Sequence, residues 1–317
     1  MCKAALIAIG FLSNTQPEPH RKHRMKILLL GKNGQVGWEL QRSLAPLGEL
    51  LALDRSSASH CGDLSNLQGL VETVRTFVPD VVVNAAAYTA VDKAESDSQT
   101  AFLVNELAPE ALSSACAAMG AYLVHFSTDY VFDGSGQKPW LETDAAGPLN
   151  VYGHSKLAGE KGIAQHASKH LILRTSWVYG TEGGNFAKTM LRLAQERERM
   201  TVINDQFGAP TGAALLADVT ALALQASKPL NGIYHLAAAG ETTWYAYAEY
   251  VLAKAKQIKP SLNYAVKDFV AVPTSEFPTP AARPLNSRLN CSRLEQALQL
   301  KLPPWQAGVD ALLTKIL

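Results

Sequence analysis

Short apolar runs alternate with longer amphipathic segments along most of the chain. The first run, KILLLG, directly follows Met25, and Val36, Leu40, Leu44 and Leu47 then recur at helical spacing. The strand-like pattern returns as ELLALD (49–54), DVVVNAA (80–86), AYLVHFST (121–128) and HLILRTSWVYG (170–180). Nearly continuous apolar strands separated by helices predict an α/β fold, a Rossmann-like doubly wound parallel sheet with helices on both faces.

The length of 317 residues exceeds one ordinary domain and predicts two packed together. We expect a dinucleotide-binding domain from residues 25–174 and about 213–240, where NGIYHLAA returns to the sheet. A smaller, interleaved C-terminal substrate domain would take about 175–212 and 241–317. Residues 1–24 hold an apolar run too short to span a bilayer, and we expect a disordered leader there.

Net charge and cysteine content limit the binding partners and the cellular compartment that the sequence predicts. Twenty-nine basic and 28 acidic residues leave a net charge of +1, which gives no field for steering towards nucleic acid or an anionic membrane. The sequence therefore predicts neither partner. The four cysteines, Cys2, Cys61, Cys116 and Cys291, form no CxxC pair, which argues against a disulfide framework and a zinc site. This pattern fits the reducing cytoplasm.

A glycine-rich turn follows the first strand. The stretch GKNGQVG spaces its glycines where a chain must turn tightly, admit a pyrophosphate to backbone amides, and pack a helix on a strand. Phosphate would sit at the N-terminus of the following helix. Spaced glycines alone are a weak signal, because a plain strand-to-helix turn shows them too. The predicted cofactor residues here are Gly31, Gly34, Gln35, Val36 and Gly37.

Asp54 strengthens the dinucleotide interpretation, because it closes the second strand about 20 residues beyond the glycines. A carboxylate at that place accepts hydrogen bonds from the adenosine ribose. Arg55 follows at once, and a guanidinium there accommodates a 2′-phosphate. The pair therefore leaves the choice between NADH and NADPH open. Further cofactor residues are expected near the adenine and after the third strand: Asp63, Leu64, Ala85, Ala86, Ala87 and Tyr88.

The segment NVYGHSKLAGEK places Tyr152 four residues before Lys156 on one predicted helix face. Reduction of a carbonyl requires an acid that protonates the oxygen, and a free phenol with a pKa near 10 suits neutral pH poorly. We expect the Lys156 ammonium, together with the charge of the nicotinamide, to lower the pKa of Tyr152, and Lys156 to hold the nicotinamide ribose. Thr128, or its neighbour Ser127, would hold the same carbonyl oxygen from the end of the fourth strand.

These residues resemble the extended short-chain dehydrogenase/reductase superfamily. Six further sequence segments are similar to the dTDP-4-dehydrorhamnose reductase family in particular: NAAAYTAVDKAE, STDYVFDG, RTSWVYG, NFAKTMLRLA, NDQFGAPT and VPTSEFPTPAARPLNSRLN. The resemblance implies NAD(P)H-dependent reduction of the 4-keto group of dTDP-4-dehydro-6-deoxy-L-mannose to dTDP-L-rhamnose, for cell-surface polysaccharide such as O antigen and lipopolysaccharide. The implied partner is a dTDP-linked keto sugar, and a homodimer is compatible with the family.

The same resemblance assigns roles to individual residues. It implies a catalytic set of Thr128, Tyr152 and Lys156. Thr128 would also contact the substrate, Asp129 and Trp177 would contact the sugar, and Arg283 would bind the nucleotide diphosphate, for which a planar guanidinium fork is suited.

Magnesium is doubtful from the sequence. Some family members are described as dimers bridged by magnesium through glutamates, and Glu39 fits one such position. However, Ala214 and Lys315 stand where other glutamates would be. Since the eight histidines show no metal-ligand spacing such as HExxH, we predict no metal site.

Two rival functions remain. A sugar-nucleotide dehydratase or epimerase of the same superfamily would keep its nicotinamide bound, but dehydratases typically follow the threonine with Asp-Glu, whereas Thr128 precedes Asp129 and Tyr130. An NADP-binding regulatory subunit, like that of methionine adenosyltransferase, would not need Tyr152 and Lys156. Release of oxidised cofactor in step with keto sugar would separate a reductase from both.

Overall fold

A computed structural model describes residues 24–317. The expected leader lies almost wholly outside the described residues. Within them, no helix is both long and apolar enough to cross a membrane.

Six strands form one parallel sheet in the order β10-β5-β4-β3-β1-β2. The predicted parallel sheet is therefore confirmed, including the strand expected at NGIYHLAA. Its members are β1 (Met25–Leu30), β2 (Gly48–Leu53), β3 (Val81–Asn84), β4 (Tyr122–Thr128), β5 (His170–Thr175) and β10 (Gly232–His235). The run predicted as one strand over 170–180 is instead broken, because Trp177 has a left-handed backbone with φ 48°.

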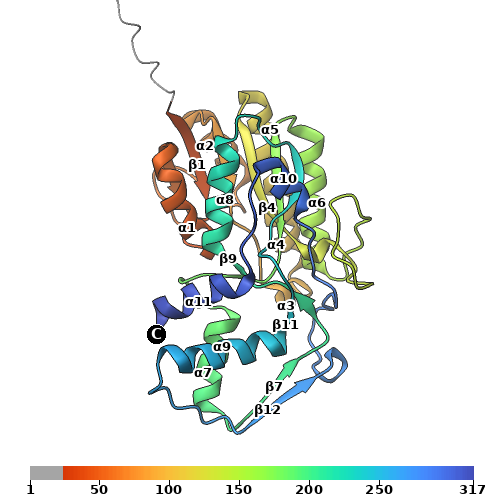
Figure 1. The fold of residues 1–317 in the computed structure, drawn as a ribbon. Coiled ribbons are helices and arrows are strands. Elements are labelled where there is room, and N and C mark those ends of the chain that lie inside the picture. The colour runs from red at the N-terminus through yellow and green to blue at the C-terminus, as the bar shows by residue number, and fades with distance from the viewer. Residues whose placement is uncertain (1–23) are drawn as a thin grey trace, which may run out of the picture.

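Helices cover both faces of this sheet (Figure 1). Along β1, Ile27 and Leu29 join the core beneath α1 and α8, whereas Leu28 and Leu30 join the core beneath α2, α5 and α6. This alternation explains the continuous apolar run, since successive strand side chains point to opposite faces and both faces are buried. The covering helices are α1 (Gln35–Leu44), α2 (Leu67–Phe77), α5 (Ala108–Met119), α6 (Val151–His166), α8 (Ala213–Gln225) and α10 (Ser292–Leu298).

A second group of elements lies below the carboxyl ends of the sheet strands in Figure 1. Its core contains stacked and edge-on aromatic rings, with Tyr247 5.2 Å from Phe186 and 5.7 Å from Trp305 between ring centroids. Its main members are α7 (Phe186–Glu196), β7 (Arg199–Ile203), α9 (Trp244–Ile258), β12 (Asp268–Val272) and α11 (Trp305–Ile316). The α10 segment does not belong to this group, because Leu294 and Leu302 pack into the core of the sheet.

Short elements connect these two parts. The short strands are β6 (Val178–Tyr179), β8 (Phe207–Gly208), β9 (Thr211–Gly212) and β11 (Thr242–Thr243). The short helices are η1 (Ala45–Leu47), α3 (Val91–Ala94), α4 (Ser98–Phe102), η2 (Leu103–Leu107), η3 (Asp129–Val131) and η4 (Thr274–Glu276).

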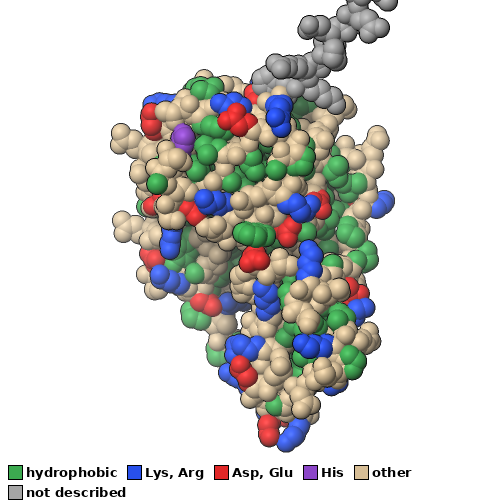
Figure 2. Space-filling model, turned by 90° about the vertical axis from the view of Figure 1, so that its left-hand side faces the viewer, with side chains coloured by type: hydrophobic (Ala, Val, Ile, Leu, Met, Phe, Trp, Pro, Cys, Tyr) green, Lys and Arg blue, Asp and Glu red, His purple; other side chains and the backbone are tan. Residues whose placement is uncertain are grey.

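Charged side chains of both signs are interspersed over the face drawn in Figure 2, with apolar side chains between them. No large area of one sign is visible on that face, in keeping with the net charge of +1.

Candidate active site

The strand order places a change of direction between β1 and β3. From β1 the chain moves to β2 on one side, and β3 and the later strands follow on the other. Ligands of open α/β sheets bind at such a point, outside the carboxyl ends of the strands. The glycine turn after β1 and the alanines after β3 both lie there, so the structure brings these two predicted segments together.

The glycine turn is too tight for side chains. Gly31 has φ +90°, and a Cβ there would lie 2.8 Å from the Ala86 nitrogen. A Cβ on Gly37 would lie 2.0 Å from the Gly31 carbonyl oxygen, because the first turn of α1 packs directly on the loop. Both glycines therefore allow a close backbone approach that any other residue would block.

The N-terminus of α1 is uncapped by side chains. Gly34 is the N-cap residue and provides no side-chain hydrogen bond, so the first-turn amides, including those of Gln35 and Val36, keep their capacity for an anion. The buried Gln35 Oε1 also lacks a partner within residues 24–317. A glycine turn with unused donors fits the pyrophosphate of a dinucleotide.

Asp54 and Arg55 lie beyond the end of β2. The Asp54 carboxylate accepts hydrogen bonds from Ser56 and Ser57 at 3.0 Å and from Asn33. These contacts, chiefly the one from Ser57, lower its pKa, so the carboxylate is ionised and oriented. Arg55 is exposed at the edge of a hollow of about 640 Å³ whose lining includes Ser57, Ala58, Ser59 and Asp63.

The other predicted cofactor residues differ in accessibility. Asp63 accepts from the Ser65 amide and hydroxyl at 2.9 and 2.8 Å, whereas Leu64 is buried in the sheet core. Ala85, Ala86 and Ala87 remain partly exposed after β3, as does Tyr88, whose hydroxyl donates to Asp97. The Leu64 side chain therefore packs into the sheet core, and a contact of this residue with the cofactor stays a prediction.

Thr128 and Tyr152 meet at the junction of β4 and α6. Asn150 begins α6 by accepting a hydrogen bond from the Gly153 amide at 2.8 Å, which fixes the helix just before Tyr152. Burial raises the pKa of Tyr152 to about 12, and the nearby Thr128 hydroxyl opposes the shift. The Oγ of Ser127 is buried and without a partner among the described residues.

Lys156 is 1% exposed and turns its terminal nitrogen into the sheet. Its Nζ lies 2.7 Å from the Phe126 carbonyl oxygen and 3.0 Å from His125 Nε2. Burial lowers the pKa of Lys156 to about 8, while the Glu160 carboxylate on the same helix opposes this. The pKa of Tyr152 is raised, not lowered as we expected, because burial outweighs the other effects on it. The effect of the nicotinamide charge stays a prediction.

Asp129 is the most strongly perturbed acid near these groups. Burial raises its pKa to about 7, against the hydroxyls of Ser287 and Thr128, which favour the ionised form. Thr128 Oγ1 donates to Asp129 Oδ1 at 3.1 Å, whereas Oδ2 is buried without a partner in the described part of the chain. An unsatisfied buried carboxyl oxygen beside the tyrosine is suited to a ligand hydroxyl.

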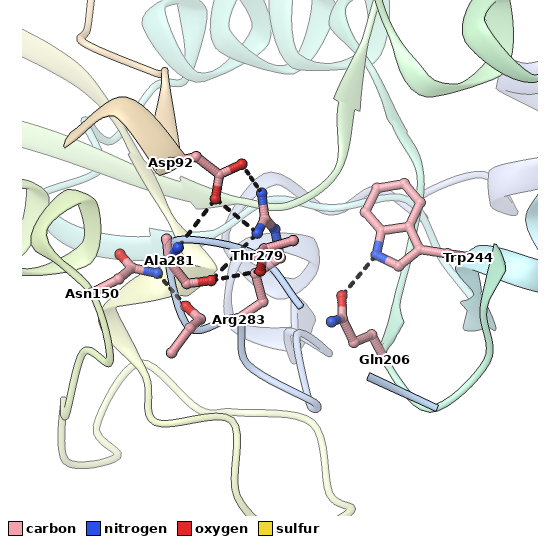
Figure 3. A network of polar contacts seen from close by, with 8 residues as sticks. Asp92, Asn150, Gln206, Trp244, Thr279, Ala281 and Arg283 are labelled. Carbon is pink, nitrogen blue, oxygen red and sulfur yellow. Dashed lines mark hydrogen bonds and ion pairs between the residues drawn. The ribbon is translucent and has the colours of Figure 1, made fainter. Parts of the chain in front are cut away.

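Arg283 is drawn towards α3 rather than left free (Figure 3). Its guanidinium donates to both carboxylate oxygens of Asp92, at 3.0 and 2.8 Å. The same carboxylate accepts from the Ala281 amide, and Asn150 Nδ2 donates to the Ala282 carbonyl at 2.7 Å. The loop that carries Arg283 is thus tied to the start of α6, and Arg283 would need to share or leave Asp92 to bind a diphosphate.

Trp177 forms a stacked pair with Trp244, with ring centroids 3.7 Å apart and planes 14° from parallel. Gln206 accepts a hydrogen bond from the Trp244 indole nitrogen at 3.1 Å, as Figure 3 shows. A Cβ on Gly208 would lie 2.6 Å from the Trp177 ring. The strained backbone of Trp177 is therefore held by close packing on two sides, and such strain often marks functional sites.

The three positions considered for magnesium carry a single carboxylate. Glu39 is buried and pairs with Arg42 at 3.2 Å, Ala214 lies on α8, and Lys315 lies on α11. Residues 24–317 contain no group of three or more His, Cys, Asp or Glu side chains arranged to hold a metal. Independence from magnesium stays a prediction.

Sequence reasoning missed four residues that shape this site: His125, Asn84, Asp92 and Trp244. His125 and Asn84 are polar residues inside otherwise apolar strand runs, which is a signal that could have found them. Asp92 and Trp244 gave no comparable signal, because each gains its role from a partner distant in sequence.

Known proteins match the chain over nearly its whole described length. The family model described as "RmlD substrate binding domain" matches residues 25–317. A dTDP-4-dehydrorhamnose reductase of Shigella flexneri is 58% identical, with 92% of this chain and 98% of the relative covered. The spore coat polysaccharide biosynthesis protein SpsK of Bacillus subtilis is 35% identical over 86% of this chain and 91% of its own length.

Solved structures agree with this result. The dTDP-4-dehydrorhamnose reductase of Bacillus anthracis in complex with NADP has a TM-score of 0.84 and 33% identity, with 92% of this chain and 99% of that chain covered. A Thermus thermophilus UDP-glucose 4-epimerase in complex with NAD has a TM-score of 0.75 at 22% identity, covering 91% and 98%, and shows the shared fold only. The chain therefore belongs to the dTDP-4-dehydrorhamnose reductase family of the extended short-chain dehydrogenases/reductases.

Proposed function

We propose that the protein reduces the 4-keto group of dTDP-4-dehydro-6-deoxy-L-mannose with NADPH or NADH, giving dTDP-L-rhamnose. The observation that carries this proposal is the contact of Thr128 with Tyr152 at the carboxyl end of β4, beside a glycine turn with uncapped helix amides. Lys156 lies one turn further along α6 and donates to the β4 backbone at Phe126. Family membership, with relatives named for this reaction, supports the substrate.

The reduced nicotinamide supplies the hydride when it is bound. Tyr152 is the acid that gives its phenolic proton to the carbonyl oxygen, and Thr128 holds the phenol and that oxygen in line. A pKa of about 12 keeps Tyr152 protonated at neutral pH, so the proton to be given is present. Lys156 holds the ribose and, once charged and close, stabilises the phenolate that forms.

The residues proposed to hold the cofactor run along the carboxyl ends of the strands. Gly31, Gly34 and Gly37 with the first amides of α1 would take the pyrophosphate. Asp54 would accept from a ribose hydroxyl, and Arg55 with the hollow beside it would accommodate a 2′-phosphate. Asp63 and the segment from Ala85 to Tyr88 would line the remaining length.

A different set of residues would bind the substrate. Asp129 would bind a sugar hydroxyl through its unpartnered Oδ2, and Trp177, stacked on Trp244, would offer an apolar surface to the sugar. Arg283 would contact the diphosphate while remaining near Asp92. We further propose that residues 25–174 and 213–240 form the dinucleotide domain and that the segments 175–212 and 241–317 form the substrate domain, apart from the α10 segment.

We also propose that the protein acts in the cytoplasm, independently of nucleic acid and membranes, and that any dimer forms without magnesium. Three of the four cysteines lie in the described part of the chain and are unpaired there, which agrees with a reducing compartment.

One assay tests the reaction against both rivals. Synthetic dTDP-keto sugar is mixed with purified protein and either NADPH or NADH, and keto sugar and oxidised cofactor are measured together. A reductase consumes them in equal amounts. Conversion of sugar with no net oxidation of cofactor would indicate an epimerase or dehydratase, and tight cofactor binding with no conversion would indicate a regulatory subunit.

A further inference from the structure

A buried chain of polar groups links Lys156 to the loop after β3. Asn84 and His125 are paired across the strands β3 and β4, and both are 1% exposed. Asn84 Nδ2 lies 3.1 Å from His125 Nδ1, and His125 Nε2 lies 3.0 Å from Lys156 Nζ. At the other end, Asn84 Oδ1 accepts from the Ala86 amide at 3.1 Å. Ala86 in turn borders Gly31 of the glycine turn.

The donors and acceptors along this chain fix the position of each proton. Since Asn84 Oδ1 accepts from Ala86, its NH₂ group must face His125, and Nδ1 must be an acceptor without a proton. Burial holds the pKa of His125 well below its usual range, so the ring is neutral and its one proton is on Nε2. That N–H points at Lys156.

Lys156 must then accept a hydrogen bond, which an ammonium group cannot do. The geometry is that of a neutral amine, whose lone pair faces His125 and whose own N–H donates to the Phe126 carbonyl at 2.7 Å. Protonation of Lys156 therefore requires the imidazole proton to be on Nδ1 instead. Asn84 must then rotate its amide to present Oδ1 to the ring, and the Ala86 amide loses its acceptor.

We propose that His125 and Asn84 are positioning residues that couple the charge of Lys156 to the Ala86 amide in the cofactor loop. The coupled change adds one proton in total: the neutral pair holds an amine and an Nε2–H imidazole, and the protonated pair holds an ammonium and an Nδ1–H imidazole. The catalytic meaning of Lys156 rests on the proposed function, whereas the coupling itself does not.

Other charged groups surround Lys156 without entering this chain. Among residues 24–317, Glu160, one turn further along α6, is the one whose charge acts on the pKa of Lys156, and it is paired with Arg174 at 2.6 Å. The remaining titratable groups on elements packed against α6 are Asp92, Lys93, Glu106, Glu110, Cys116, Tyr122, Asp129, Tyr130, His170 and Arg174.

Nuclear magnetic resonance of the isotope-labelled full chain without nucleotide or sugar tests the coupling. The ¹⁵N shifts of the His125 ring, the ¹³Cε shift of Lys156 and the Ala86 amide are followed from pH 6.5 to 10. We expect an Nε2–H ring at high pH that changes to Nδ1–H as Lys156 gains its proton, with all three signals sharing one midpoint. A ring that keeps one tautomer while Lys156 titrates would overturn the proposal.

His235 is the control within the same spectra. It is buried, its Nδ1 lies 3.0 Å from the Trp140 carbonyl oxygen, and it lies outside the chain of contacts. Because a carbonyl can only accept, His235 should stay Nδ1–H over the whole range. A tautomer change at His235 with the same midpoint would mean that a general structural transition is observed, which would also overturn the coupling.

Asn84→Asp sharpens the test. A carboxylate accepts from the Ala86 amide and from His125 Nδ1–H at once, so His125 should be Nδ1–H at every pH and the midpoint of Lys156 should rise by about one pH unit or more. Asn105→Asp is the matched control, because this buried asparagine contacts Tyr88 and Ser155 but not His125. It should leave the tautomer change in place.

Each outcome is decisive. If Asn105→Asp abolishes the tautomer change as Asn84→Asp does, any buried charge is sufficient to fix the His125 tautomer, and the proposed coupling is rejected. If Asn84→Asp fails to fold, the titration of the unmodified chain still decides. Since none of these signals requires turnover, a failed reductase assay and a failed coupling are distinguished.

Discussion

The charged residues at the two ends of the candidate cofactor site differ in burial. At the junction of β4 and α6, Asp129 and Lys156 are 2% and 1% exposed, and burial moves both pKa values towards neutrality. Beyond β2, Asp54 and Arg55 lie near the surface, where water and salt screen their contacts. We therefore expect the buried end to determine protonation of the substrate and the exposed end to determine which nucleotide is bound.

Removing the acid at the buried end should have the largest effect. Tyr152→Phe keeps the ring but removes the proton donor, so kcat should fall by about 10²- to 10⁴-fold. The dissociation constant for NADPH should change little, because the phenol is assigned to the carbonyl rather than to the cofactor. Steady-state kinetics and calorimetry measure the two effects, and near-normal turnover would remove Tyr152 from its assigned role.

Asp129→Asn tests whether burial costs stability at the same end. Burial raises the pKa of Asp129 in the folded state to about 7. Its contribution to the free energy of unfolding is therefore complete below the ordinary pKa of an aspartate and is lost as the pH rises through 7. Replacing it by a neutral amide should raise the free energy of unfolding by about 4 kcal/mol at pH 8 and by less at pH 5. Urea unfolding at both pH values measures this, and an equal change at both would contradict a titrating carboxyl.

Lys156→Met should separate stability from function. The folded pKa of about 8 lies below the usual value near 10.4. Between these two pH values the unfolded state therefore binds a proton that the folded state has lost. The stability of the unmodified chain should rise with pH between 8 and 10.5, and the variant should lack about 3 kcal/mol of this rise. Turnover and cofactor affinity should both fall. Unchanged affinity would show that Lys156 does not hold the ribose.

The sequence predicted the strands and the two motifs, but not the electrostatics of the site. Continuous apolar runs identify strands buried on both faces, and the spacing of Tyr152 and Lys156 identifies a shared helix face. The contact of Lys156 with His125 depends on which strands are neighbours, and Asp92 meets Arg283 across 191 positions. Burial could not be read from local spacing either, which is why the predicted direction of the Tyr152 pKa shift was wrong.

The exposed end should respond more weakly. Asp54 and Arg55 together should allow both nucleotides to work within about tenfold of one another, because each favours one form of the ribose. Arg55→Ala should weaken NADPH binding and spare NADH, since Asp54 keeps its contacts with Ser56 and Ser57. Fluorescence titrations give both dissociation constants. Equal losses for the two nucleotides would show that Arg55 does not read the phosphate.

The smallest expected effect is that of removing magnesium. A bridging divalent ion needs several oxygen ligands. Glu39 is already paired with Arg42, Ala214 offers no side-chain oxygen, and Lys315 would bring a like charge. Turnover and molecular mass should therefore be unchanged after treatment with excess EDTA. The control is the same preparation with magnesium added back. Activity that is lost in EDTA and restored by magnesium, but not by potassium, would mean that other ligands hold the ion and that the surface end of the molecule also contributes to the chemistry.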